Sequence, residues 1–401
     1  MKKGGIPRVV WLLGLVSLCM DLSSEMIHSL RPVFLVSLLG ASTVTLGLIE
    51  GIAEGTASIT KVFSGVLSDH IGRRKPLLVI GYGLAALSKP LFPLATSANW
   101  VLSATFADRI GKGIRGAPRD ALVADTTPTD VRGAAYGLRQ SLDTVGAILG
   151  PLAAVGLMVL VAGDIRKVFW VAVLPAIAAV ALLVLGVREP ERHIDPREQP
   201  SIPRWRDLRR FPRGFWVVVA IGAVVTMARF SEAFLVLRTS DAGLSRDWIP
   251  LVLVVMNLTY VASAYPAGWL SDRAGRMGLL MLGLGVIIAA DAVLAISRTL
   301  SMVFVGIALW GLHMGLTQGL FAALVADTAP TDLRGSGFGV FNFVSGVFAI
   351  FSSLLAGALW MWHGPTVTFF TGAAFSAVAL AGLIWWWLRY PRTKRESSGN
   401  H

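Results

Sequence analysis

Long apolar segments follow one another along almost the whole chain, separated by short stretches of glycine, proline or charged residues. Each segment is close to the ~20 apolar residues that a helix needs to cross a bilayer. Hydrophobic residues make up 54% of the chain and charged residues 15%, against about 25% charged in an ordinary globular protein. Twelve spans would use roughly 240 residues of the 401 present. No room remains for a large catalytic domain outside the membrane.

We therefore predict an all-α membrane protein with about twelve transmembrane helices. The first six are expected at Val9–Leu39, Thr43–Asp69, Pro76–Thr96, Trp100–Ala124, Gly133–Val161 and Val168–Val187. The second six are expected at Phe215–Leu237, Trp248–Asp272, Gly278–Ser297, Leu300–Ala326, Gly335–Trp362 and Thr366–Arg389. These runs divide the chain into a bundle of six helices at 1–187, a solvated linker rich in arginine and proline at 188–213, and a second bundle with a tail at 214–401.

Basic residues fall on alternate loops, as the positive-inside rule describes for cytoplasmic loops. Lys2, Lys3 and Arg8 precede the first apolar run, and Arg73, Arg74 and Lys75 follow the second. Others are found in the linker and after the last run, whereas the intervening loop at 39–43 carries no charge. This pattern places both termini in the cytoplasm, in a multi-pass protein of a bacterial-type inner membrane. It also accounts for the net charge of +12 without nucleic acid as a partner.

An internal repeat relates the two halves of the chain. The segment Ala121–Gly133 returns as Ala323–Gly335, with 11 of 13 positions identical at an offset of 202. The segment Gly65–Asp69 returns as Gly268–Asp272. Because six helices precede each recurrence, the two halves share one topology. We predict parallel repeats related by an axis along the membrane normal.

Three motifs carry a resemblance to the major facilitator superfamily of secondary transporters. The stretch Gly65–Lys75 is similar to the superfamily's loop motif G-x-L-A/S-D-x-x-G-R-R/K, and the second copy, Gly268–Arg276, keeps its glycines, leucine, aspartate and arginine. Arg109–Gly113 resembles the R-x-x-x-G motif, and Gly146–Pro151 resembles the G-x-x-x-G-P motif of the antiporter branch. The resemblance implies two six-helix bundles around a central site, with alternating access by rocking of the bundles.

The repeated loop motif also predicts a latch at the cytoplasmic face. A turn bracketed by glycines lets neighbouring helices approach closely, and Arg74 or Arg73 can pair with Asp125 or Asp130 in the first half. Asp272 and Arg276 would meet Asp327 or Asp332 in the second half. The alternative is ordinary charge balancing between loops. The residues expected in this gate are Gly65, Asp69, Gly72, Arg73, Arg74, Asp125, Arg132, Gly268, Asp272, Gly275, Arg276, Asp327 and Arg334.

We interpret Gly146, Gly150 and Pro151 mainly as structural residues. Small residues one turn apart permit close packing of helices in membranes, and proline kinks a helix. We expect these three residues to act in packing or as a hinge rather than to contact a substrate.

Ionisable side chains within a span are costly and are first considered as functional residues. A proton carrier needs a carboxylate whose environment changes as the transporter opens and closes, with a cation that comes and goes beside it. Our candidates are Asp21, Glu25 and Glu54, with Arg109 as the displaceable partner. The alternative is that these residues form static pairs between helices.

Charged candidates for the wall of a central cavity are concentrated in the first half, and polar or aromatic ones in the second. This division suggests proton coupling in the first half and substrate contacts mainly from the second. The cavity candidates are His28, Arg31, Glu50, Lys112, Arg115, Asp143, Arg229, Glu232, Asn257, Tyr260, His313, Gln318 and Asn342. The ninth expected helix also contains one aspartate, Asp291.

Other classes of function find less support in the sequence. A soft metal site at His313 and Met314 lacks a repeated partner pattern on facing helices, and no phosphate-binding loop for ATP is present. We therefore expect no metal, no cofactor and no enzymatic activity. The prediction is a monomeric, proton-coupled efflux transporter for a small organic compound. Uptake or export of an anionic metabolite or siderophore, or a polytopic sensor or assembly protein without transport, remain alternatives.

Overall fold

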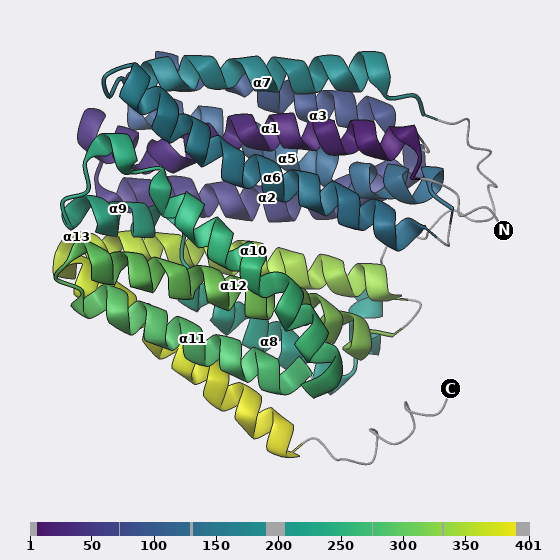
Figure 1. The fold of residues 1–401 in the computed structure, drawn as a ribbon. Helices are drawn as coiled ribbons and strands as arrows, with labels where there is room; N and C mark the ends of the chain where they lie inside the picture. The colour runs from purple at the N-terminus through teal and green to yellow at the C-terminus, as the bar shows by residue number, and fades with distance from the viewer. Residues whose placement is uncertain are drawn as a thin grey trace.

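The computed structural model describes residues 6–71, 73–128, 131–189, 205–274, 276–330 and 333–389. Its 12 helical spans lie side by side in two bundles, the first coloured purple to teal and the second green to yellow (Figure 1). The predicted all-α architecture is confirmed. The first helix starts and the last helix ends toward the same end of the molecule, which we call the terminal end (Figure 1). The other end is called the remote end.

The first bundle contains seven helical segments that form six spans. α1 (Arg8–Val33) continues into a π-helical turn, Phe34–Leu38. The segments that follow are α2 (Thr43–Ile71), α3 (Lys75–Ser88), α4 (Leu91–Leu94), α5 (Ala98–Thr126), α6 (Arg132–Leu160) and α7 (Ile165–Gly186). α3 and α4 belong to one span, which is interrupted at Lys89 and Pro90, because proline lacks the N–H that a continuous helix requires.

The second bundle follows a short 3₁₀ helix, Trp205–Arg210. It consists of α8 (Arg213–Ala228), α9 (Ala233–Asp241), a 3₁₀ turn (Arg246–Trp248), α10 (Leu251–Ala274), α11 (Arg276–Ile296), α12 (Leu300–Thr328) and α13 (Arg334–Arg389). α8 and α9 form one span. α13 contains the last two spans, which meet at Gly364, where φ is +78°.

Most spans meet the usual criteria of length and apolarity for crossing a membrane. Among the described residues, 9 continuous helical segments do so, and the segment Arg334–Arg389 holds two of the spans. α2 and α5 do not meet the criteria, because both carry several ionisable side chains. Those two helices therefore need neighbours that neutralise their charges.

The seventh span lies where it was expected, around Phe215–Leu237, but it is broken and not one continuous helix. α8 ends at Ala228, Arg229 has φ −97° and ψ 73°, and α9 starts only at Ala233. The Ser231 hydroxyl accepts a hydrogen bond from the Ala233 N–H at 3.2 Å and so helps to begin α9. At the break, a side-chain hydroxyl thus accepts a hydrogen bond from a backbone N–H that a backbone carbonyl would accept in a continuous helix.

The turns at the remote end are short and depend on glycine. Gly40, Gly163, Gly243 and Gly364, with φ between +66° and +91°, adopt the left-handed conformation that other residues rarely take. Each lies in or beside a connection between two consecutive spans of the remote end.

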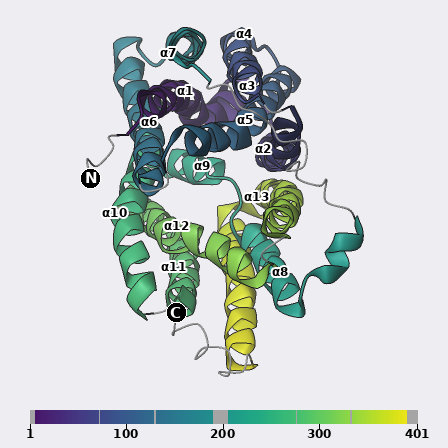
Figure 2. The same ribbon diagram turned by 90° about the vertical axis from the view of Figure 1, so that its right-hand side faces the viewer.

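Buried apolar residues of the described chain form separate clusters at the two ends of the molecule. At the remote end, one cluster joins the bundles and includes Leu30 and Phe34 of the first bundle with Phe234 and Trp310 of the second. Toward the terminal end each bundle has its own cluster. Viewed from the terminal end, α9 lies where the second bundle borders on the first (Figure 2). The two bundles therefore share one apolar core at the remote end, whereas each has an apolar core of its own toward the terminal end.

Candidate functional site

A seam of glycines joins α2 to the first part of α13. A methyl group on Gly47 would collide with the backbone carbonyl of Ser353, and one on Gly51 would collide with the backbone of Ile350. At the remote end of the seam, the Thr43 hydroxyl donates to the carbonyl oxygen of Gly357 at 2.9 Å. Backbone contact of this kind is what small residues permit between membrane helices. The seam brings the charged face of α2 to the boundary between the bundles.

Glu50 of α2 is the centre of a buried cluster near the remote end. The Arg31 guanidinium donates to both Glu50 oxygens, with Nη2 at 2.7 Å from each. The two side chains are only 3% and 1% exposed. His28 lies 3.3 Å from Glu25 and 3.8 Å from Glu50, and Ser231 of the broken seventh span donates to Glu50 at 2.9 Å. Glu50 is therefore fully paired, and it connects the two bundles.

A second cluster lies halfway along α5. The Lys89 ammonium, at the interruption between α3 and α4, donates to Asp108 at 2.8 Å and to Ser24 of α1 at 2.9 Å. Lys89 was not among the residues predicted for the site. A lysine directly before a proline within an apolar run is a signal that could have identified it, because such a charge needs a partner in the membrane.

Glu54 is held much more loosely than Glu50 or Asp108. Its nearest cation is Arg109, with Nη1 3.8 Å from Oε1, and the Glu54 side chain is 52% exposed. The second contact of Arg109 is also long, because its Nε lies 3.9 Å from Oδ2 of Asp108. This buried Nε has no hydrogen-bond partner among the described residues. Lys112, one turn further along α5, is exposed. The predicted neighbourhood of Glu54 and Arg109 is present, and their contact is long enough to be broken by a competing group.

A third cluster lies toward the terminal end. Asp21 of α1 is 3.8 Å from Arg115. Asp143 of α6 is 2.8 Å from Arg139 and 3.5 Å from Arg119. This cluster ties α1, α5 and α6 together. It places Asp143 in an ion-pair network rather than alone on a cavity wall.

The second bundle presents two charged residues to the first at the break between α8 and α9. Arg229 interacts electrostatically with Glu54 and Glu232, and Glu232 interacts with His28 and Glu25. Both charges therefore face the acidic residues of α1 and α2. Glu54 therefore has an ion-pair contact with Arg109 of its own bundle and an electrostatic interaction with Arg229 of the other.

The other predicted residues of the second bundle occupy different environments. Asn257 donates to the Ala147 carbonyl of α6 at 3.1 Å, which is a contact between the bundles. His313 is 0% exposed, and its Nδ1 lies 2.8 Å from the Gly283 carbonyl, so it does not line a space open to solvent. Tyr260 and Asn342 are half-buried. The side chain of Gln318 lies outside the described residues.

The repeated loop segments make equivalent contacts in the two halves. Arg132 donates to the carbonyl of Ala124 at 3.3 Å, and Arg334 donates to the carbonyl of Ala326 at 3.1 Å. In each half a basic side chain thus satisfies a carbonyl in the last turn of the preceding helix. The ion pair expected between Arg74 and Asp125 is present at 3.5 Å.

The remaining gate residues can be placed only in part. Arg73 is exposed, and Asp327 is exposed at the end of α12. Gly65 packs against Ala117 of α5, and Gly268 belongs to α10. Seven residues predicted for the gate or as its ion-pair partners fall outside the described residues, either entirely or in their side chains: Asp69, Gly72, Asp130, Asp272, Gly275, Arg276 and Asp332.

Gly146 and Gly150 lie where α6 crosses α1. A methyl group on Gly146 would collide with the Leu18 carbonyl, and one on Gly150 would collide with Glu25. Pro151 follows directly inside the same helix. These glycines set the distance between α1 and α6.

Comparisons with known proteins agree with this architecture. The family model of the Major Facilitator Superfamily matches residues 13–353 and 233–401. An uncharacterized MFS-type transporter of Methanocaldococcus jannaschii is 30% identical over 388 residues, which cover 93% of this chain and 94% of that protein. A gentisate transporter of Corynebacterium glutamicum is 28% identical over 362 residues, which cover 86% of this chain and 80% of that protein.

A solved structure has the same fold at low sequence identity. A POT family transporter in complex with 5-aminolevulinic acid superposes with a TM-score of 0.78 and 13% identity, over 95% of this chain and 96% of that one. Fold, family model and relatives all agree with the resemblance carried by the sequence motifs. This chain, an integral multi-pass membrane protein, belongs to the major facilitator superfamily of membrane transporters.

Proposed function

We propose that this transporter couples the movement of protons to the efflux of a small organic compound, with Glu54 as the proton carrier. The observation that carries the proposal is the position of Glu54. It is a half-exposed carboxylate in the middle of α2, held by one long contact to Arg109 and facing Arg229 of the other bundle. When the bundles rock apart, the distance between Glu54 and Arg229 changes. A carboxylate that gains and loses a cation in this way changes its affinity for protons.

The other buried carboxylates are better suited to structural roles. Glu50 accepts two short hydrogen bonds from Arg31, and Asp108 accepts one from Lys89. A compound entering the site would have to break these bonds to compete for the carboxylate, and breaking a buried pair is costly. Glu54 offers the same charge to a substrate with far less to disrupt.

The proposal includes an orientation in the membrane and a gate. We place both termini, and therefore the terminal end, in the cytoplasm of a bacterial-type inner membrane, because basic residues gather on those loops. The apolar cluster shared at the remote end then closes the outside, and the pair Arg74–Asp125 belongs to a latch that rearranges as the inside closes. Efflux is supported by the similarity of Gly146–Pro151 to the antiporter motif. The working unit is a monomer.

Transport of an organic anion is a second candidate, favoured by two observations. Lys112 is exposed on the same helix as Arg109, so protonation of Glu54 would leave cations free to bind a carboxylate. The relative from Corynebacterium glutamicum is named as a transporter of gentisate, an aromatic carboxylate. In this case proton and anion would move together.

Proton movement in sealed liposomes tests the proposal. Purified protein is offered cationic, neutral and anionic compounds in groups, and a pH-sensitive dye is recorded inside the vesicles. Wild type is expected to move protons when a compound of one group is added, outward with compound moving inward for antiport and in the same direction for symport. Glu54→Gln is expected to lose at least tenfold of this proton flux, because glutamine cannot exchange a proton.

Two controls separate loss of coupling from loss of folding. Glu54→Gln is expected to retain exchange of labelled compound across the membrane in the absence of any gradient. Asp241→Asn, which changes an exposed carboxylate at the end of α9, is expected to behave as wild type. Proton flux that survives in Glu54→Gln would disprove the role of Glu54, and compound movement without protons in wild type would disprove proton coupling.

A further inference from the structure

Asp291 of α11 is a buried carboxylate that the proposed transport mechanism does not use. Its side chain is 0% exposed. Oδ1 accepts a hydrogen bond from the Trp310 indole N–H of α12 at 3.0 Å. Oδ2 has no hydrogen-bond partner among the described residues. One neutral donor is little compensation for a charge buried in a membrane protein.

The internal repeat shows what is unusual about this position. At the offset of 202, Asp291 corresponds to Lys89 and Trp310 corresponds to Asp108. The first bundle therefore holds a lysine and an aspartate, 2.8 Å apart, whose charges cancel. The second bundle holds an aspartate and a neutral indole in the same arrangement. A bound proton or metal cation would make this position electrically neutral as well.

Oδ2 of Asp291 is directed at Gly372 in the last part of α13. A methyl group on Gly372 would lie 2.7 Å from Oδ2 and 3.3 Å from the carbonyl oxygen of Ala228. α8 ends at Ala228, so this carbonyl lacks the intrahelical N–H that it would otherwise bind. An unpartnered carboxylate oxygen and a helix-terminal carbonyl thus approach the same bare glycine.

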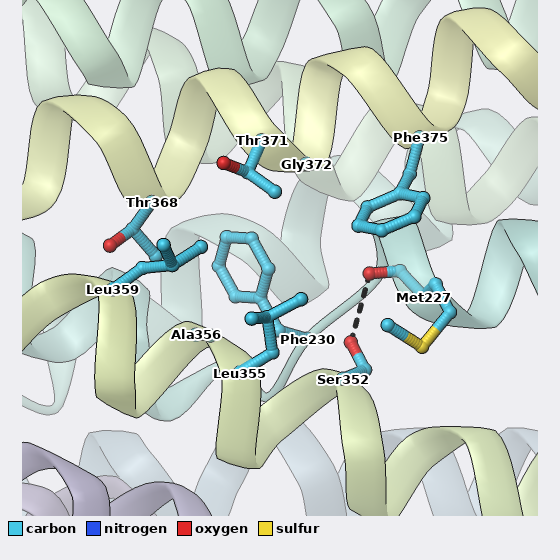
Figure 3. A pocket seen from close by; sticks show the side chains of 10 residues that line it. All are labelled: Met227, Phe230, Ser352, Leu355, Ala356, Leu359, Thr368, Thr371, Gly372 and Phe375. Carbon is cyan, nitrogen blue, oxygen red and sulfur yellow. Dashed lines mark hydrogen bonds between the residues drawn. The ribbon is translucent and has the colours of Figure 1, made fainter.

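The surroundings of this glycine leave little space. Figure 3 shows Phe230 from the break after α8 beside Gly372, at a small cavity that is also lined by Met227 and Thr368. The Phe230 ring would lie 3.0 Å from a methyl group on Gly372. The hydroxyl of Ser376, one turn after Gly372, is also buried without a partner among the described residues.

We propose that Asp291 is a proton-binding site of the second bundle, with the proton on Oδ2 facing the Ala228 carbonyl. The carboxylic acid accepts the Trp310 N–H through Oδ1, and its proton on Oδ2 lies on the side of Gly372, which the Ala228 carbonyl also approaches. One proton thereby neutralises the site that joins α11 to α12. The site is separate from Glu54, and the proposal does not depend on the proposed transport mechanism.

The charged and titratable neighbours favour a proton over a metal ion. Arg229, in the segment after α8, has its guanidinium 6.0 Å from the centre of the Trp310 ring and makes no ion pair with Asp291, and Arg238 of α9 is bound to the Leu294 carbonyl. His313 of α12 is bound to Gly283. Hard metal ions require about six oxygen ligands. The oxygens near Gly372 are too few, and the packing of Phe230 is too close, for such an ion.

Infrared difference spectroscopy of the full-length protein in lipid nanodiscs tests this assignment. Wild type at pH 7 is expected to show the carbonyl stretch of a protonated carboxylic acid, and Asp291→Asn is expected to lose that band. Asp241→Asn, which changes an exposed carboxylate, is expected to keep it. Trp310→Phe, which leaves the acid in place, is expected to shift the band to higher frequency, because the C=O loses its only hydrogen-bond donor.

The possible outcomes distinguish the proposal from its rivals. A band that is unchanged in both Asp291→Asn and Trp310→Phe would show that Asp291 is ionised, and would overturn the proposal. A band that disappears when sodium chloride replaces choline chloride at constant pH would assign the site to sodium instead. If Asp291→Asn fails to fold, the shift in Trp310→Phe still decides the result. None of these readings depends on transport, so the failure of the Glu54 mechanism would be recognised separately.

Discussion

Replacing Gly47 by valine is expected to abolish transport by forcing α2 away from α13 at the remote end. The added side chain would overlap the backbone carbonyl of Ser353, and a backbone atom cannot move aside as a flexible side chain can. Overpacking of this kind costs about 1–3 kcal/mol or more. Because each ~1.4 kcal/mol changes an equilibrium tenfold, the closed arrangement of the remote end would lose roughly tenfold to hundredfold in population.

Labelling of a single cysteine measures this opening directly. In a Cys19→Ser background, Ser353→Cys places a thiol in the seam, where the side chain is 2% exposed. The thiol is expected to resist a membrane-impermeant maleimide in the parent and to react in Gly47→Val. Gly83→Val is the matched control, because a methyl group on Gly83 would meet nothing within 4 Å. Equal labelling of the two valine variants would contradict the proposed seam.

Removing Arg31 is expected to cause the largest loss of stability of any single substitution in the charged clusters. Arg31→Met leaves Glu50 buried at 1% exposure without the three hydrogen bonds that Nε and Nη2 of Arg31 donate. Breaking a buried pair on one side costs about 3–5 kcal/mol, because the remaining charge stays unpaired. The free energy of unfolding in mild detergent is expected to fall by about this amount, or the protein is expected not to accumulate in folded form.

The double variant provides the decisive comparison for Arg31. Arg31→Met combined with Glu50→Gln removes both charges, so most of the lost stability is expected to return. His28 would remain beside Glu25. If the double variant is as unstable as the sum of the two single variants, Arg31 and Glu50 do not stabilise one another and the cost must have another origin.

Much of the fold could be predicted from the sequence, because membrane spans are recognised by their length and apolarity alone. The break at Arg229 could not, since residues 223–232 contain neither glycine nor proline. A contact from the other bundle, Ser231 to Glu50, is present at this break, and no local pattern records it. By contrast, the separation of the last two spans was expected between Trp362 and Thr366, and the structure places it at Gly364.

The sequence predicts which face of a helix carries the residues of the candidate site, but not which residues of other helices pair with them. Helical spacing places Glu50 and Glu54 on the same side of α2, and both indeed face charged residues of other helices. Yet one is locked to Arg31 and the other is loosely held by Arg109. That difference depends on the distances from Glu50 to Arg31 and from Glu54 to Arg109, which no local pattern in the sequence records. Lys89 was not predicted as a site residue, and its partner Asp108 belongs to another helix, so no local pattern shows the pair.

The apolar cluster shared by the two bundles determines how the rate of transport depends on temperature. In the proposed cycle, opening the remote end separates Leu30 of α1 and Phe34 of the π turn from Phe234 of α9 and brings water between them. Hydration of apolar surface raises the heat capacity, so the enthalpy of this step changes with temperature. The rate of a cycle limited by that opening follows a curved rather than a straight Arrhenius plot. How the transporter responds to cooling is thus determined at the end of the molecule opposite to its termini.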